Sequence, residues 1–112
     1  MAQSTRPRKI IVYADAQGSE PFTEWLYSFK DSRTRQRIEN RIDRMETGNY
    51  GDFKSLKDGL FELRFFFGSG YRVYFAEDGG TVVLLLSGGD KSTQDKDIKA
   101  AREYWKEYKT ND

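Results

Sequence analysis

The sequence predicts one α+β domain over residues 1–112, with the element order β-α-α-β-β-β-α. Two segments with helical spacing of apolar side chains come first, three strand-like segments joined by glycine-rich turns follow, and an amphipathic helix ends the chain. A period of 3.6 residues identifies the helices, and a period of 2 identifies the strands. We expect a mainly antiparallel sheet, a helical hairpin on one of its faces, and a flexible tail over residues 1–8.

A strand and a helix are predicted near the start of the chain. Residues 10–13 are apolar and follow a polar, basic segment, as is typical of a strand. Ser19 is suited to cap a helix, and Pro21 fits the first turn of that helix. Apolar side chains then recur at the i, i+3, i+4, i+7 positions of one helical face, up to Phe29.

A second helix follows after a residue or two, which predicts the hairpin. Asp31 or Ser32 can cap this helix, and Gly48 ends it. Its apolar face consists of Ile38, Ile42 and Met45. Its opposite face carries Arg33, Arg35, Arg37, Arg41 and Arg44. These arginines are able to grip an RNA backbone, but Glu39 and Asp43 lie among them, which favours a solvated face with i,i+4 ion pairs.

The second half of the chain predicts an antiparallel meander and a last helix. The three strands span residues 60–67, 71–76 and 81–87, and a brief strand around Ser55 precedes them. Gly88-Gly89 ends the meander. Ser92 and Asp95 have the spacing of a capping box at the start of the helix. In its aromatic cluster, Tyr104, Trp105 and Tyr108, we expect Trp105 to be core, although exposed tyrosines can stack on bases.

Alternation along the strands places four polar side chains on one face of the sheet: Glu62, Arg64, Arg72 and Tyr74. The opposite face is the natural core face beneath the helical hairpin. Two guanidinium groups on a rigid sheet suit an anionic ligand such as a phosphodiester, because they bind phosphate oxygens bidentately. The alternative is a solvated sheet face with ordinary Glu–Arg pairs, which the pattern alone favours.

A second candidate anion site is the segment 88–92. It lies between a strand end and a helix start, where free amides and the helix dipole attract anions, and Lys91 adds a positive charge. The alternative is a connecting loop with glycines and a capping serine. Both interpretations remain open from the sequence.

The chain contains no His and no Cys, which excludes several kinds of chemistry. A disulfide framework, a thiolate zinc site, a Ser-His-Asp triad and histidine acid–base catalysis all require one of these residues. No metal site or cofactor is expected. The start of the chain has no apolar targeting segment, and no run is long enough to span a bilayer, so we expect a cytoplasmic protein.

Three motifs together resemble the RelE/ParE superfamily of toxin–antitoxin toxins. They are Leu60-Phe61-Glu62-Leu63-Arg64, Gly70-Tyr71-Arg72-Val73-Tyr74-Phe75, and Gly88-Gly89-Asp90-Lys91-Ser92-Thr93-Gln94 after the last strand. The sequence is most similar to the HigB-like "addiction module killer protein" branch, and the likeness covers about residues 12–108. The resemblance implies the RelE/ParE-like fold and a type II toxin neutralised by a cognate antitoxin.

The resemblance also implies an activity. RelE-like members cleave messenger RNA on the ribosome without a metal, through attack of a 2′-OH on the adjacent phosphate. By position, Arg64 matches an arginine used at the scissile phosphate, and Arg72 matches the arginine of the Gly-Tyr-Arg segment. Lys91 stands where a basic residue follows the last strand. Lys54 and Lys57 lie in a segment that supplies basic residues in several members.

The remaining roles follow from the residue types available. Glu62, Lys54 or Lys57 is the candidate base, and Tyr74 and Ser92, with Lys54, are candidate RNA contacts. No residue is assigned as general acid, because the histidines of some HigB enzymes are absent and no tyrosine matches their catalytic one. Two alternatives stay open: a ParE-like toxin that inhibits DNA gyrase through contacts, and a non-catalytic interaction module. For antitoxin docking, the exposed side of the helix pair and the strand edge at residues 10–13 are candidates.

Overall fold

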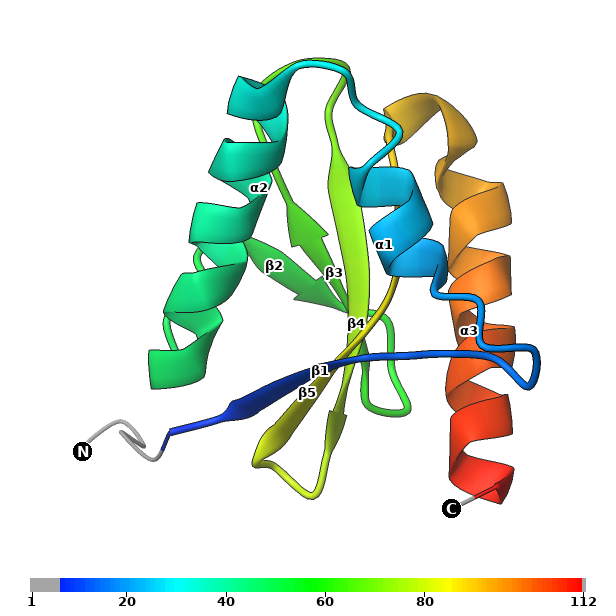
Figure 1. The fold of residues 1–112 in the computed structure, drawn as a ribbon. Coiled ribbons are helices and arrows are strands. Elements are labelled where there is room, and N and C mark those ends of the chain that lie inside the picture. The colour runs from blue at the N-terminus through cyan, green and yellow to red at the C-terminus, as the bar shows by residue number, and fades with distance from the viewer. Residues whose placement is uncertain (1–6, 112) are drawn as a thin grey trace.

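The computed structural model describes residues 7–111 and confirms the α+β class (Figure 1). The strands are β1 (Lys9–Val12), β2 (Phe53–Ser55), β3 (Leu60–Arg64), β4 (Arg72–Asp78) and β5 (Val82–Gly89). The helices are α1 (Pro21–Leu26), α2 (Ser32–Asp43) and α3 (Gln94–Thr110). Short 3-10 turns, η1 (Arg44–Thr47) and η2 (Lys91–Thr93), follow α2 and precede α3. The element order is the expected one, with β2 near the brief strand anticipated around Ser55.

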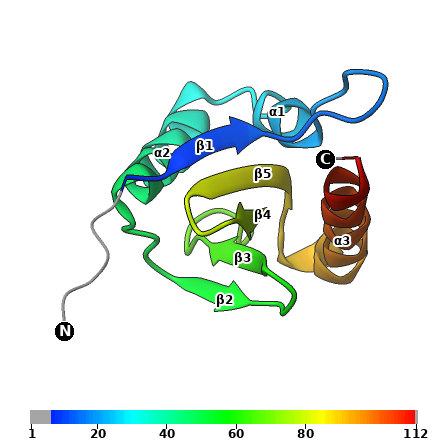
Figure 2. The same cartoon turned by 90° about the horizontal axis from the view of Figure 1, so that it is seen from below.

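The strands form one five-stranded sheet in the order β1-β5-β4-β3-β2 (Figure 2). The meander β3-β4-β5 is antiparallel, as predicted, and β2 pairs antiparallel with β3. β1 joins the other edge and runs parallel to β5. The register sets Arg64 opposite Arg72, and Arg72 opposite Gly89. The ends of β3 and β5 and the start of β4 therefore meet at one end of the sheet.

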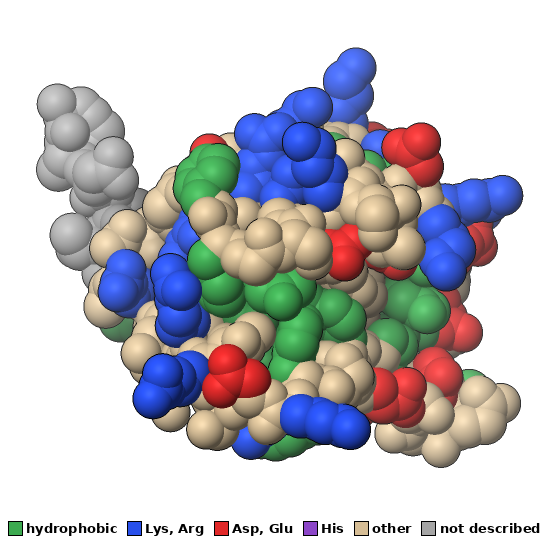
Figure 3. Space-filling view, turned by 90° about the horizontal axis from the view of Figure 1, so that it is seen from above, with side chains coloured by type: hydrophobic (Ala, Val, Ile, Leu, Met, Phe, Trp, Pro, Cys, Tyr) green, Lys and Arg blue, Asp and Glu red, His purple; other side chains and the backbone are tan. Residues whose placement is uncertain are grey.

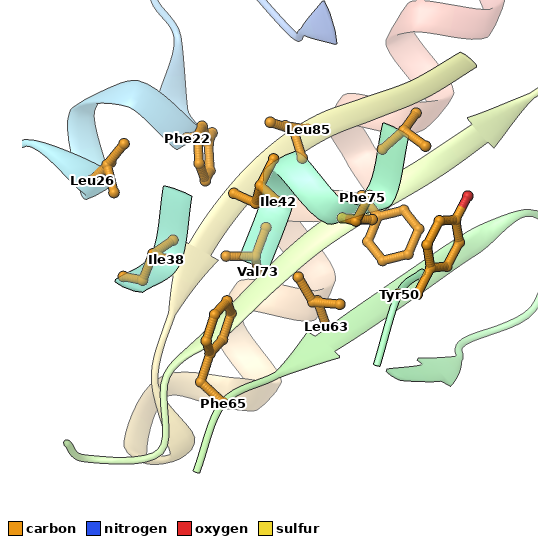
Figure 4. Close-up of a cluster of buried hydrophobic side chains, with 12 residues drawn as sticks. Phe22, Leu26, Ile38, Ile42, Tyr50, Leu63, Phe65, Val73, Phe75 and Leu85 are labelled. Carbon is orange, nitrogen blue, oxygen red and sulfur yellow. The ribbon is translucent and has the colours of Figure 1, made fainter. Parts of the chain in front are cut away.

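The helical hairpin covers one face of the sheet, as expected. Figure 4 shows the core that forms there, in which α1 and α2 side chains meet alternate residues of the strands. Phe22 and Leu26 come from α1, Ile38 and Ile42 come from α2, and Val73 lies beneath them. Asp31 caps α2 by accepting a hydrogen bond from the Arg33 amide, and Gly48 ends the following turn with φ of 87°. Asp31 was one of the two predicted caps, and Gly48 was the predicted end.

Helix α3 covers the opposite face, and the prediction of a solvated polar face is wrong there. Ala101 and Trp105 of α3 pack against the sheet in a second apolar cluster, and Tyr74 of β4 belongs to that cluster. Glu62 and Tyr74 are both 0% exposed. The physical reason is that the same alternation also places Leu60, Ala76, Leu84 and Leu86 on this face, and these residues need an apolar cover.

Several element boundaries differ from the predictions for local reasons. Helix α1 ends at Leu26 rather than near Phe29, because the Ser28 hydroxyl donates to the Trp25 carbonyl at 2.6 Å and closes the last turn. Gly88 and Gly89 do end the meander, but as the last two residues of β5, which runs beyond the predicted end at residue 87. The capping box before α3 is formed by Asp90 and Thr93, not by Ser92 with Asp95.

The expected tail is described only at its end, because residues 1–6 lie outside the described part of the chain. Arg8 is anchored: its amide donates to the Glu46 carbonyl at 2.8 Å, and its guanidinium lies over the Tyr50 ring. Within residues 7–111, no helix combines the length and the apolar character that crossing a bilayer requires.

Candidate anion-binding site

Two arginines meet at the end of the sheet around one buried carboxylate. Arg64 is the last residue of β3, and Arg72 is the first residue of β4, directly opposite it. Arg64 Nε lies 3.4 Å from Glu62 Oε1, and Arg72 Nε lies 3.9 Å from Glu62 Oε2. The Arg64 side chain is 34% exposed and the Arg72 side chain 11%, whereas Glu62 is fully buried. The buried Glu62 carboxylate is therefore the counter-charge of both guanidinium groups.

Two further groups fix the Glu62 carboxylate. Gln94 Nε2 donates to Glu62 Oε2 at 2.7 Å, and the Tyr74 hydroxyl donates to the same oxygen at 3.2 Å. Burial, followed by the nearby Glu62 charge, raises the pKa of Tyr74, so this phenol stays a hydrogen-bond donor. Sequence reasoning missed Gln94 as a site residue. Its position in the Gly-Gly-Asp-Lys-Ser-Thr-Gln motif, at the start of α3, was the available signal.

Lys91 and Arg72 both lie next to Gly70. Arg72 Nη1 donates to the Gly70 carbonyl at 3.0 Å, which fixes the direction of its guanidinium. A Cβ on Gly70 would lie 3.4 Å from Lys91 Cβ and 3.6 Å from Arg72 Nη1. Gly70 also has a φ of 78°, so a side chain there is disfavoured on backbone grounds as well. The structure therefore brings Lys91 close to the arginine pair.

The two other candidate lysines have different positions. Lys54 of β2 pairs in register with Glu62, so it shares the face of the arginine pair, and it is exposed. Lys57 lies in the β2–β3 turn with φ of 75°, at the opposite end of β3 from Arg64. Four residues of strand separate Leu60 from Arg64, which is roughly 13 Å. The structure does not bring Lys57 to the arginine pair.

The segment 88–92 is organised around its own carboxylate. Asp90 accepts hydrogen bonds from the Ser92 amide at 2.9 Å and the Ser92 hydroxyl at 2.6 Å. The Ser69 hydroxyl donates to the same side chain at 3.0 Å. The hydrogen bonds from Ser92 and Ser69 lower the pKa of Asp90. Asp90 thus occupies the place proposed for an external anion, and Ser92 serves as its partner.

Gly88 and Gly89 allow helices to approach β5 from both faces. A Cβ on Gly88 would lie 2.2 Å from the Trp25 ring, on the α1 side. A Cβ on Gly89 would lie 1.8 Å from Asp97 Oδ2, on the α3 side. Both glycines are therefore packing residues, which neither interpretation of this segment anticipated.

The arginines of α2 are not a uniformly solvated face. Arg41 is half-buried, and its guanidinium donates to the carbonyl oxygens of Tyr50, Asp52 and Arg64. Burial lowers the pKa of Arg41. Arg35 donates to the Phe29 carbonyl. Among residues 7–111, the expected i,i+4 ion pairs with Glu39 and Asp43 are not formed.

The aromatic cluster of α3 is used in packing. Trp105 is 7% exposed, which confirms its prediction as core. Tyr104 stacks on Tyr13, and the Tyr108 hydroxyl donates to Asp78.

The chain is similar in sequence to known proteins. The family model described as "Phage derived protein Gp49-like (DUF891)" matches residues 24–106. An uncharacterized protein of Haemophilus influenzae is 54% identical over 81 residues, covering 72% of this chain and 82% of the relative. The chain belongs to the Gp49-like family. This family is toxin-like and of the RelE/HigB kind, so the resemblance seen in the sequence holds at that level.

In this Gp49-like protein, the matched region includes the whole sheet site. Residues 24–106 contain the arginine pair, its carboxylate and the start of α3. Arg64 and Arg72 are both paired with Glu62 and partly open to solvent, so their guanidinium groups are able to bind phosphate oxygens. Glu62 has no exposed surface through which to reach a substrate.

Proposed function

We propose that this Gp49-like protein is the toxin of a type II toxin–antitoxin module and that it cleaves messenger RNA on the ribosome. The observation that carries the proposal is the register pair Arg64–Arg72, held by the fully buried Glu62 with Lys91 beside it. Such a preorganised cationic pair suits the dianionic phosphorane of RNA cleavage better than it suits a neutral ligand.

The proposed reaction is an internal transfer of the phosphodiester. The ribose 2′-oxygen forms a bond to the adjacent phosphorus, and the bond from phosphorus to the 5′-oxygen breaks. A base removes the 2′ proton, and an acid protonates the departing 5′-oxygen, which leaves a cyclic phosphate and a 5′-hydroxyl. The Arg64 and Arg72 guanidinium groups neutralise the charge that develops on the non-bridging oxygens.

The acid and base are assigned by position. Lys54 on β2 and Lys91 after β5 flank the arginine pair across the sheet order β5-β4-β3-β2. We propose Lys54 as the base and Lys91 as the acid, because in-line displacement needs these groups on opposite sides of the phosphorus. Glu62 becomes a positioning residue, because both of its oxygens face the arginines, Gln94 and Tyr74.

A cognate antitoxin is the proposed partner, as the toxin-like family suggests. Strand β1 lies at the edge of the sheet, and its Val12 is 37% exposed. An added antitoxin strand can complete such an edge through main-chain hydrogen bonds. The exposed side of the α1–α2 pair remains the other candidate surface for the antitoxin.

The test is induced expression of the full chain, with mapping of new RNA 5′ ends and of growth. Arg64→Ala and Arg72→Ala are each expected to reduce cleavage about 100-fold or more, as loss of a transition-state donor does. Arg33→Ala is the matched control, because Arg33 is an exposed arginine at the start of α2. Cleavage by Arg33→Ala is expected to equal that of the wild type.

Other outcomes separate the alternatives. Growth arrest without new 5′ ends contradicts the nuclease, and gyrase–DNA adducts in those cells indicate a gyrase-directed toxin. Harmless expression without antitoxin indicates a non-catalytic module.

A further inference from the structure

A groove of about 350 Å³ lies between α2 and the segment that follows β3. One wall consists of Arg37, Asn40 and Arg41 of α2 with Arg44 of η1, and residues 65–67 form the other. We call it the Phe66 groove. It lies on the α2 side of the sheet, whereas the Arg64 and Arg72 side chains lie on the α3 side with Glu62; the two regions meet at the end of β3.

Phe66 is an unusually exposed aromatic side chain for a chain of this size. It is 86% exposed, while its neighbour Phe65 is buried in the core at 3%. Phe67 is partly buried, and the Arg37 guanidinium lies 3.7 Å from its ring centroid. Viewed from the end at which α2 and α3 begin, basic side chains gather beside exposed apolar ones (Figure 3). An exposed aromatic ring next to arginines is suited to a ligand that has both a planar ring and a negative charge.

Two of the three groove arginines, Arg37 and Arg44, have no carboxylate partner within residues 7–111. Both side chains are exposed. Glu39 and Asp43 are close in sequence but do not pair with them. For Arg41, burial lowers the pKa most, the nearby Asp52 charge raises it, and the Arg44 charge lowers it by less. An anionic ligand would balance the charges of Arg37 and Arg44.

The groove is tied directly to the proposed cleavage site. Arg41 Nη1 donates to the Arg64 carbonyl at 2.7 Å, and Arg41 Nη2 donates to the Asp52 carbonyl at 2.8 Å. Phe66 follows Arg64 by two residues, a separation of roughly 7 Å along an extended chain. A polymer bound at the Arg64 side chain would therefore pass around the end of β3 to reach Phe66 and the groove arginines on the α2 side.

We propose that the Phe66 groove binds the part of a single-stranded RNA next to the cleaved phosphate. A base stacks on Phe66, while Arg37 and Arg44 contact the backbone phosphates. This inference rests on the proposed function and extends its site. RNA fits better than an acidic protein segment, because the groove joins a phosphate site and alternates cations with a flat ring, as single-strand binders do.

The test measures binding of a short fluorescent single-stranded RNA whose 2′-hydroxyls are methylated, so that it is not cleaved. The purified full chain is compared with Phe66→Leu, with Arg37→Gln/Arg44→Gln, and with the control Arg33→Gln, an exposed arginine outside the groove. Loss of one stacked base is expected to weaken binding roughly tenfold. Loss of two phosphate contacts is expected to reduce the salt slope of log K by about 1.4. Arg33→Gln is expected to match the wild type in both.

The results distinguish the groove from the cleavage site. Equal RNA binding by the wild type and the groove variants overturns this inference and leaves the proposed function standing. A wild-type protein that binds no RNA, with or without ribosomes, overturns both. Groove variants that keep RNA binding but lose the antitoxin would also overturn it and assign the groove to the protein partner.

Discussion

Glu62 is fully buried between two guanidinium groups, and its charge decides whether both arginines keep their positions. A buried carboxylate that is already paired cannot also collect a proton from a substrate outside. Contact with a substrate is therefore left to Arg64 and Arg72, whose side chains are partly exposed. Another glutamate also lies between a tyrosine and an arginine: Glu77 accepts a hydrogen bond from the Tyr50 hydroxyl and lies 4.0 Å from Arg8 Nε.

Glu62→Gln is expected to destabilise the protein by about 2 kcal/mol, because two arginines lose a buried counter-charge while remaining partly hydrated. It is also expected to lower kcat for RNA cleavage much more than it raises KM, because the guanidinium groups lose their fixed geometry. Urea unfolding and single-turnover cleavage measure the two effects.

Glu77→Gln is the matched control for that prediction. It makes the same chemical change in a similar Tyr–Glu–Arg arrangement, away from the arginine pair. We expect it to lower stability and leave kcat unchanged. Wild-type kcat in Glu62→Gln would show that Glu62 does not position the arginines.

At the scale of the element, β5 is a strand that side chains of α1 and α3 approach closely, one from each face of the sheet. Gly88 lies against Trp25, whose ring is confined by Phe29 at 5.1 Å and by Tyr71 at 6.2 Å. Gly89 lies against Asp97, a short side chain that accepts a hydrogen bond from Thr93. The two glycines therefore face neighbours that differ in their freedom to move.

Gly88→Ala is expected to destabilise the protein more than Gly89→Ala does. A Cβ at Gly88 would overlap the large Trp25 ring, which packs edge-on against Phe29 and Tyr71, so overpacking should cost about 3 kcal/mol, whereas the short Asp97 side chain can rotate away for about 1 kcal/mol. Midpoints of urea unfolding at equal m-values give the comparison. Gly79→Ala is a useful control, because a Cβ at Gly79 meets nothing within 4 Å and only its φ of 65° is unfavourable. The reverse order for Gly88 and Gly89 would contradict the packing argument.

Patterns among neighbouring residues predicted the elements well. They did not predict features that depend on contacts between residues far apart in the chain. The cap at Asp31, the stop at Gly48 and the Arg64–Arg72 face follow from neighbouring residues, so the sequence contained them. The parallel pairing of β1 depends on β5, which is some seventy residues away. Gln94 reaches Glu62 only because α3 returns across the sheet. Periodicity within one strand carries no information about which helix covers it.

The whole molecule has three layers, with α1 and α2 on one face of the sheet and α3 on the other (Figures 1 and 2). The third layer also contributes to the site. Gln94 at the start of α3 donates a hydrogen bond to Glu62, the carboxylate that pairs with both arginines. Packing along α3 and the geometry of the cationic pair are therefore coupled. Trp105 is the largest α3 side chain in this layer, and its Nε1 donates to the Asp58 carbonyl at 2.7 Å.

Trp105→Ala is expected to destabilise the protein by about 3–5 kcal/mol, the usual cost of emptying a buried tryptophan site. If the three layers fold as one unit, urea unfolding should keep a single transition and an unchanged m-value, because α3 and the sheet then lose structure together. Lys106→Ala, an exposed neighbour on α3, is expected to change stability by less than about 0.5 kcal/mol. Two separate transitions in Trp105→Ala would show that α3 detaches from an otherwise folded sheet, and the coupling between this layer and the site would then be wrong.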